Sequence, residues 1–326
     1  MTLLLVLGLF LLVGAALFSL LAGSTDIGLG RLWAAVWGGS KTDPAARILR
    51  YVRLPRTLGS LLCGGALAMA GAVTQGVLGN RLASPAVIGV NAGAGLAVTL
   101  CASLGVFGGF RLSLCAFCGA LLAVLLVSLG ASKWGASRGT VILMGVALNA
   151  LFGAISDMII TFSPELAIQN AEFKVGDFSS VTDQKLIPAT VMILVAGGIL
   201  LTLSCQLDVL SLGEESAMSL GMNTGAMRVV FLLLAALLAG AAVSLAGLLS
   251  FVGLLVPHAV RRMLGGTRGL LPLCALFGAG FVTLCDTLSR TLFAPYEVPV
   301  GILMALLGAP CFLWILLRRK GGEGHA

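Results

Sequence analysis

Long apolar runs dominate the chain, and short polar segments separate them. Ten runs occur, at about 3–22, 57–79, 86–107, 112–131, 140–162, 187–205, 228–249, 251–260, 270–294 and 299–317. A helix needs about 20 apolar residues to cross the hydrocarbon layer of a membrane, and all but the run 251–260 approach that length. The pattern therefore predicts an all-α polytopic membrane protein with about ten transmembrane helices.

Composition agrees with this prediction and narrows it. Of 326 residues, 59% are hydrophobic and only 10% are charged, whereas roughly a quarter of the residues of a soluble domain are charged. The 44 glycines lie mostly inside the apolar runs, where small residues let membrane helices pack closely. We therefore expect a single transmembrane domain over 1–326. The net charge of +7 is read as loop charge that sets topology, not as a nucleic-acid surface.

Basic residues do not decide the orientation by number alone. If the N-terminus is inside, ten basic residues lie in inner loops and ten in outer ones. Six of the outer ten are concentrated in the segment 23–56, namely Arg31, Lys41, Arg47, Arg50, Arg53 and Arg56. Cytoplasmic loops usually hold the excess of basic residues, so this concentration indicates a function. We predict cytoplasmic termini and an outer segment 23–56.

Two apolar stretches form a weak internal repeat. "GGALAMAG" (64–71) and "GAAVSLAG" (240–247) are identical at four of eight positions. Related halves are common among transporters, so the repeat suggests two related halves here.

The polar segment 207–227 is too long for a simple turn. Within it, "LGEESAMSLG" (212–221) predicts a short amphipathic helix between Gly213 and Gly221, with Leu212, Ala217 and Leu220 on one face and Glu214, Glu215 and Ser219 on the other. A short exposed helix with an apolar stripe fits a groove on a partner protein. A simple interfacial helix is an equal alternative.

The ionisable residues in the apolar runs bear on the energy source. Asp157, Asp286 and Arg290 lie toward the ends of their runs, and no carboxylate stands near the middle of a run. Ion-coupled carriers usually place ionisable groups there. "GGSKT" (38–42) lacks the glycine spacing of a phosphate-binding loop. The chain is therefore expected to draw its energy from a separate protein.

Other candidate motifs favour structural roles. His258 follows Pro257 and has no second histidine, cysteine or carboxylate at a metal-binding spacing. The glycine-rich segment 79–98 lies between membrane runs, whereas phosphate-binding glycines precede a helix after a strand. These features indicate gating, a hinge or close helix packing. No metal, cofactor or catalytic residue is predicted.

Five motifs together resemble a known family. They are "RLPR" before a Gly/Ala-rich run, "GNRLASPAVIGVNAGAGL", "LGEESAMSLG", "GLLSFVGLLVPHAVRR" and "EVPVGILMALLGAP". In this order they resemble the FecCD-type permeases of bacterial ABC importers for iron-siderophores, heme and vitamin B12. The chain departs from the family at Arg81, where the family has proline, and around Phe173 and Gly176-Asp177. These departures leave the substrate open.

The resemblance implies a complete import machine in the bacterial cytoplasmic membrane. It implies a vitamin B12 importer-like fold of ten helices per subunit, a permease dimer (a homodimer is expected), two cytoplasmic ATPases and an extracytoplasmic substrate-binding protein. The family's docking arginines correspond to Arg53, Arg56 and Arg290, which would pair with glutamates of the binding protein. Arg47 and Arg50 are expected to extend toward lipid headgroups.

The resemblance also assigns the remaining sites. The ATPase-coupling residues would be Leu212, Gly213, Glu214, Ala217, Leu220 and Gly221, and the gating or pathway residues would be Asn80, Pro85, Asn91, Gly93, Pro257 and His258. The chain is thus expected to be a transport subunit without enzymatic activity. Its leading substrate is a ferric siderophore, with heme or a corrinoid as alternatives. An ion-coupled secondary carrier is the alternative from another class.

Overall fold

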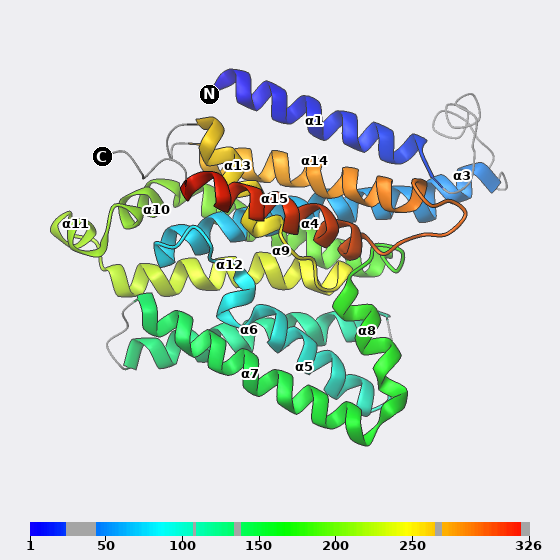
Figure 1. Cartoon of the computed structure of the whole chain (residues 1–326), viewed down its shortest axis with the longest axis horizontal. Helices are drawn as coiled ribbons and strands as arrows, with labels where there is room; N and C mark the ends of the chain where they lie inside the picture. Colours follow the sequence, from blue (N-terminus) through cyan, green and yellow to red (C-terminus); the bar gives the residue numbers. More distant parts are fainter. Residues whose placement is uncertain (24–43, 107–108, 134–137, 265–268, 321–326) are drawn as a thin grey trace.

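The computed structural model describes residues 1–23, 44–106, 109–133, 138–264 and 269–320, and every regular element in these ranges is a helix or helical turn (Figure 1). The first part of the chain forms α1 (Thr2–Leu21), α3 (Pro44–Ile48), η1 (Leu49–Arg53), α4 (Leu54–Leu78), η2 (Pro85–Ile88), α5 (Val90–Ser103), α6 (Gly109–Lys133) and α7 (Arg138–Phe162). The second part forms η3 (Pro164–Leu166), α8 (Ala167–Val175), α9 (Asp183–Thr202), α10 (Ser204–Ser211), α11 (Glu214–Ser219), α12 (Thr224–Ala246), α13 (Val252–Leu264), α14 (Leu270–Thr291) and α15 (Val300–Lys320).

Each of the ten predicted apolar runs coincides with a helix, which confirms the predicted fold class. Within the described ranges, seven helices are long and apolar enough to cross a membrane: α1, α4, α6, α7, α9, α12 and α14. α5 and the segment Val300–Leu313 of α15 are shorter apolar helical stretches. The short run 251–260 forms α13, which has 13 residues and contains Pro257.

Helix α4 lies at the centre of the bundle. It packs against α14, α12 and α13, and α1 covers the other side of α14 (Figure 1). Helices α5, α6 and α7 form a second group, which joins the first where α12 meets α6. Most of α4 is buried, whereas most of α1 and α7 is exposed, as expected for helices that face lipid. The repeat stretches 64–71 and 240–247 lie on the neighbouring helices α4 and α12, and the relation of the two halves stays a prediction.

Glycines set the closest helix contacts. A Cβ atom at Gly64 of α4 would collide with the backbone of Gly278 on α14, and one at Gly93 of α5 would collide with the backbone of Gly119 on α6. Without a hydrophobic force between helices in lipid, such close backbone contact is a main source of helix association.

The bundle has two polar ends, which are named here by their contents. The arginine end holds Arg53, Arg56 and Arg290, where α1 and α14 finish and α4 begins. The α11 end lies opposite (Figure 1). Helix α1 begins and α15 finishes at the α11 end. The start of the first helix and the finish of the last therefore lie at the same end of the bundle, as the predicted topology requires.

Candidate functional site

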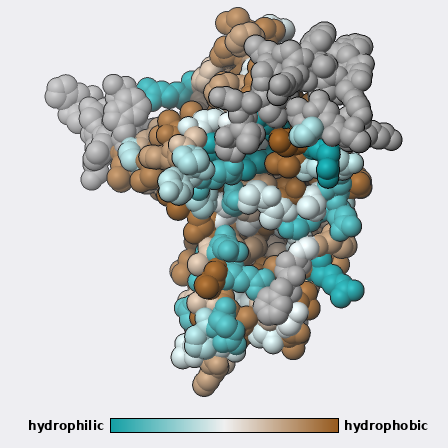
Figure 2. All heavy atoms as spheres, turned by 90° about the vertical axis from the view of Figure 1, so that its right-hand side faces the viewer, coloured by the Kyte–Doolittle hydropathy of each residue, from teal (hydrophilic) through white to brown (hydrophobic). Residues whose placement is uncertain are grey.

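The start of α4 brings two arginines to the arginine end. The π-helical segment η1 runs directly into α4, and Pro55 is the second residue of α4. Arg53 and Arg56 are three residues apart and therefore lie on one side of the helix. Arg290 lies in the last turn of the adjacent α14. Hydrophilic residues gather on this end of the molecule (Figure 2).

Arg56 is the centre of a charged cluster. Its side chain is 6% exposed, and its Nε donates to Oδ1 and Oδ2 of Asp286 at 3.0 and 3.2 Å. Its Nη1 donates to Oε2 of Glu297 at 2.8 Å, and its Nη2 lies 3.6 Å from Oδ1 of Asp177. Asp286 is fully buried on α14. Arg56 therefore joins α4 to α14, to the segment before α15 and to the loop after α8.

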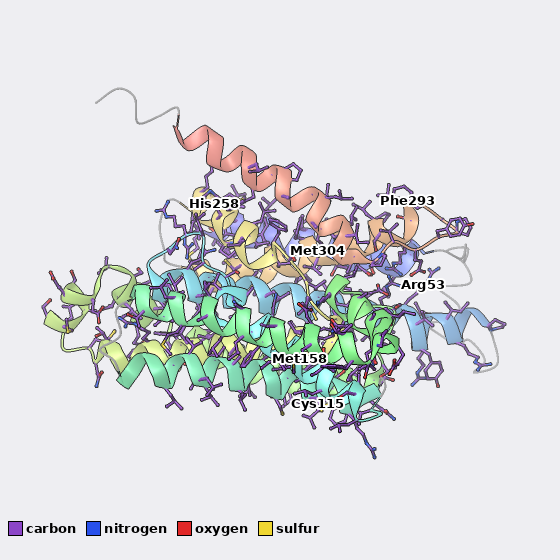
Figure 3. The ribbon with its side chains drawn as sticks, turned by 60° about the horizontal axis from the view of Figure 1, so that its bottom comes forward. Arg53, Cys115, Met158, His258, Phe293 and Met304 are labelled. Carbon is purple, nitrogen blue, oxygen red and sulfur yellow. The ribbon has the colours of Figure 1, made fainter. Side chains whose placement is uncertain are left out.

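Arg53 and Arg290 hold the end of α1. Nη1 of Arg53 donates to the carbonyl oxygens of Leu20 and Leu21 at 2.8 and 3.0 Å. Nη2 of Arg290 donates to the carbonyl and hydroxyl oxygens of Ser19 at 2.9 and 2.6 Å. The last carbonyls of a helix have no partner within it, so the two arginines cap α1 and fasten it to the end of η1 and to α14. Figure 3 shows Arg53 and Phe293 at this same end.

The structure thus brings the three predicted docking arginines together, but it buries them. Sequence reasoning noticed Asp286 near the end of its run and did not pair it. It missed Ser19, Asp177 and Glu297 as partners. The available signal was general: an ionisable residue in a membrane helix normally has a partner within the protein.

At the α11 end, the predicted short helix is confirmed, but the predicted apolar face is wrong. Ala217 is fully buried, whereas Leu212 and Leu220 are 70% and 67% exposed. The reason is that α11 turns the small alanine toward its own chain. Ala217 therefore cannot contact a partner directly in this conformation, while both leucines can.

Glu214 fastens α11 to α12. Its Oε2 accepts from Nη2 of Arg228 at 2.8 Å, and Arg228 is buried on α12. The Thr224 hydroxyl lies 3.5 Å from Oε1 of the same carboxylate. Asn223 begins α12 by accepting from the Ala226 N–H at 3.1 Å, a standard N-cap. Gly221 has a φ of +82°, which permits the tight turn between the two helices.

Two predicted pathway residues line a cavity of about 250 Å³. Pro85, the first residue of η2, and Asn91 of α5 line it together with Phe251 and Leu254. Phe251 has a φ of +66°, a left-handed conformation that is rare for a bulky residue. Sequence reasoning missed Phe251, because nothing in "LLSFVG" distinguishes a strained phenylalanine from a helical one.

The other predicted pathway residues lie elsewhere. Gly93 packs against Gly119, and Asn80 accepts from the Leu82 N–H at 2.9 Å in an exposed turn. Pro257 is buried in α13, and His258 is half-buried toward the α11 end (Figure 3). The six residues therefore do not form one site. Within the described ranges, no three His, Cys, Asp or Glu side chains are grouped to hold a metal.

A bundle of apolar helices with a buried charge cluster at one end and a fastened short helix at the other defines a multi-pass membrane protein. Its sequence matches the FecCD transport family over residues 11–318, and the chain belongs to that family.

Individual relatives match nearly the whole chain. It is 36% identical over 324 residues to the hemin transport system permease protein HmuU of Yersinia pestis, which covers 95% of each chain. It is 36% identical over 289 residues to the Fe(3+) dicitrate transport system permease protein FecC of Escherichia coli, covering 87% of this chain and 86% of FecC. A solved structure described as an inward-facing metal-chelate type ABC transporter matches with a TM-score of 0.87 and 31% identity, covering 98% of this chain and 100% of that one.

Proposed function

We propose that the chain is the permease subunit of an ABC importer that carries a metal chelate across the bacterial cytoplasmic membrane. The observation that supports this most is the family match over residues 11–318. A ferric siderophore is the leading substrate, and heme or a corrinoid is the alternative. The named relatives carry hemin and ferric dicitrate, so membership of the family alone does not choose among chelates.

The two polar ends receive different partners in this proposal. The arginine end faces outward and docks the substrate-binding protein through Arg53, Arg56 and Arg290. The α11 end faces the cytoplasm and contacts the ATPase, together with both chain termini. Two copies of the permease and two ATPase subunits complete the importer.

The coupling residues divide into two groups. Leu212 and Leu220 are exposed and would contact the ATPase, with Gly213 and Gly221 shaping the turns that present them. Ala217 and Glu214 face this chain's own helices and would pass the motion of α11 to α12. Pro85 and Asn91 line the cavity beside Phe251, which we assign to the substrate path.

The rival is an ion-coupled secondary carrier, and Asp286 is its natural ion-binding candidate. However, Asp286 is held by Arg56 at 3.0 Å and lies 3.6 Å from Arg290. A coupling carboxylate must bind and release its ion during each cycle. Asp286 is already neutralised by two arginines, so its role is that of a structural ion-pair partner. The arrangement therefore supports the importer.

Reconstitution in liposomes tests the proposal. The probes are hemin, ferric dicitrate, a ferric hydroxamate and cobalamin, each offered with and without the ATPase subunits and internal MgATP. We expect uptake of one probe only when the ATPase, MgATP and the substrate-binding protein are present. Uptake by the chain alone on a proton or sodium gradient would establish the carrier instead.

A further inference from the structure

Three arginines and three carboxylates form a charge-balanced cluster at the arginine end, beside the exposed Arg47 of α3 and Arg50 of η1. The positive side chains are Arg53, Arg56 and Arg290, and the negative ones are Asp177, Asp286 and Glu297. A balanced cluster attracts an acidic protein surface weakly, because steering depends on complementary net potential. One of the three carboxylates must therefore give way before an arginine of this cluster can bind an incoming glutamate or aspartate.

Two of the carboxylates are held too firmly to leave. Asp286 is 0% exposed and accepts from Arg56 through both oxygens, and moving a buried charge from its partners is strongly unfavourable. Asp177 lies further from Arg56, at 3.6 Å, and its Oδ1 accepts from the Phe178 N–H at 2.7 Å. That bond belongs to the local turn, so Asp177 stays in place whatever Arg56 binds.

Glu297 is the carboxylate that can leave. Its side chain is 38% exposed, and its described contact is a single hydrogen bond from Nη1 of Arg56. It belongs to the segment 292–299, in which Leu292, Phe293 and Tyr296 are also exposed. Water can therefore solvate Glu297 as soon as it turns away, at little cost.

We propose that Glu297 is an internal stand-in for an acidic side chain of the docking protein. A glutamate or aspartate of that protein takes the place of Glu297 on Nη1 of Arg56, and Glu297 turns into solvent. The inference rests on the proposed function, because the partner is the extracytoplasmic substrate-binding protein. Arg53 and Arg290 donate to carbonyl oxygens at the end of α1, so Arg56 is the arginine of the three that makes the exchange.

The exchange has a mechanical consequence, because Glu297 lies three residues before α15 begins. Its release removes one of the ties at the entry to that helix. Two others remain, from the Val298 N–H to the Ser289 carbonyl at 3.1 Å and from the Gly301 N–H to the Gly176 carbonyl at 3.2 Å. Docking would thus loosen the start of α15 without detaching it from α14 and the loop after α8.

The test uses Glu297→Gln in the complete transporter, reconstituted in nanodiscs. The matched control is Asp183→Asn, an exposed carboxylate at the start of α9 that forms no ion pair with any described residue. The first readout is modification of Arg56 by phenylglyoxal, followed by mass spectrometry. The second is the affinity for the transporter's own soluble substrate-binding protein. In Glu297→Gln we expect the rate of Arg56 modification and the affinity for the binding protein each to rise by about fivefold, the effect of removing one partly exposed ion-pair competitor. In Asp183→Asn we expect no change in either quantity.

A third variant, Arg56→Glu, separates this inference from the proposed docking role, with Arg56→Lys as the substitute if the first does not fold. Weaker binding by the Arg56 variant supports docking at this end. If binding in Glu297→Gln is then unchanged or weaker, the exchange is overturned and docking stands. If the Arg56 variant binds like the wild type, docking at Arg56 is itself overturned.

Discussion

Arg56 at the start of α4 and Arg228 near the start of α12 hold their glutamates in the same way. In both pairs the atoms are 2.8 Å apart, the arginine side chain is 5–6% exposed and the glutamate is 38% exposed. The surroundings differ. Arg56 also binds the fully buried Asp286, which keeps its charge balanced when Glu297 moves. Glu214 lies on the six-residue helix α11, and the Thr224 hydroxyl of α12 lies beside its carboxylate. Glu214 therefore has two partners on α12.

An ion pair of one geometry can serve as an exchange site, as proposed for Glu297, or as a fastener, as at Glu214. The difference lies in what remains after the glutamate leaves. At the arginine end a second carboxylate stays behind. At the α11 end the loss of Glu214 detaches a short helix from α12. Two substitutions test this distinction, a third tests the coupling role proposed for the α11 end, and a pair of single cysteines tests which end faces outward.

The largest effect is expected from Asp286→Asn. The change keeps the shape of the side chain but leaves Arg56 and Arg290 buried without their shared carboxylate, which typically costs about 3–5 kcal/mol. The measurement is unfolding of the purified chain by SDS titration in mixed micelles. Asp157→Asn is the control, because Asp157 forms an exposed pair with Lys174 at 3.9 Å and should change stability by less than about 1 kcal/mol. Equal stability of the two variants would show that Asp286 does not balance the buried charge of Arg56.

A smaller effect is expected from Glu214→Gln. The amide can still accept a hydrogen bond from Arg228, but the loss of charge assistance should cost about 1–2 kcal/mol by the same SDS titration. Glu215→Gln, one residue away on an exposed position, should be neutral. Transport per ATP hydrolysed should fall only in Glu214→Gln if the pair transmits motion. A normal ratio in a destabilised variant would mean that the pair is structural only.

Gly221→Asp should cost roughly 1 kcal/mol, because φ at this position is +82° and L-residues are disfavoured there. The chain should fold, and the added carboxylate beside the exposed Leu220 should uncouple the ATPase. Gly225→Asp makes the same chemical change on the first turn of α12, where an acidic residue is favourable. Both transport and ATPase stimulation are measured, and normal values of both in Gly221→Asp would contradict the coupling role.

Single cysteines at Ser40 and Gly321 test the predicted topology and are expected to have the smallest effect on function of the four sets. Both sites lie outside the described residues. A background without the exposed Cys118 and Cys205 is needed. We expect an impermeant thiol reagent to label Ser40→Cys from outside and Gly321→Cys only after permeabilisation. Labelling of both from one side would overturn the ten-helix topology.

The helices were predictable from sequence because lipid imposes a single strong requirement. The backbone N–H and C=O groups of an apolar run in lipid must form their hydrogen bonds within the run, which makes it a helix. The position of each helix can therefore be predicted from the local sequence. Even the short run 251–260 was recognisable, although its extension to Leu264 was not. The predicted gathering of Arg53, Arg56 and Arg290 also followed from the order of the spans and the family motif.

The pairing inside the sites was not predictable in the same way. Arg56 and Glu297 are separated by 241 positions in sequence, and their contact depends on how α4 and α14 cross. Ala217 was placed on the wrong face because the helical pattern ranks residues by polarity. Packing in this segment instead selected the smallest side chain. Phe251 adopts its conformation through contacts with distant helices, including the face of α15 at Gly308.

The contact between Gly64 and Gly278 brings the backbones of α4 and α14 directly together. Their backbones touch where any added side-chain atom would collide, so neither helix can slide or rotate against the other without losing that contact. Movement during a transport cycle must then occur at other helix boundaries. A pair of spectroscopic labels on the exposed faces of these two helices provides a reference distance. We expect the distance between these two labels to stay constant during a transport cycle, and distances from them to other helices to report any movement.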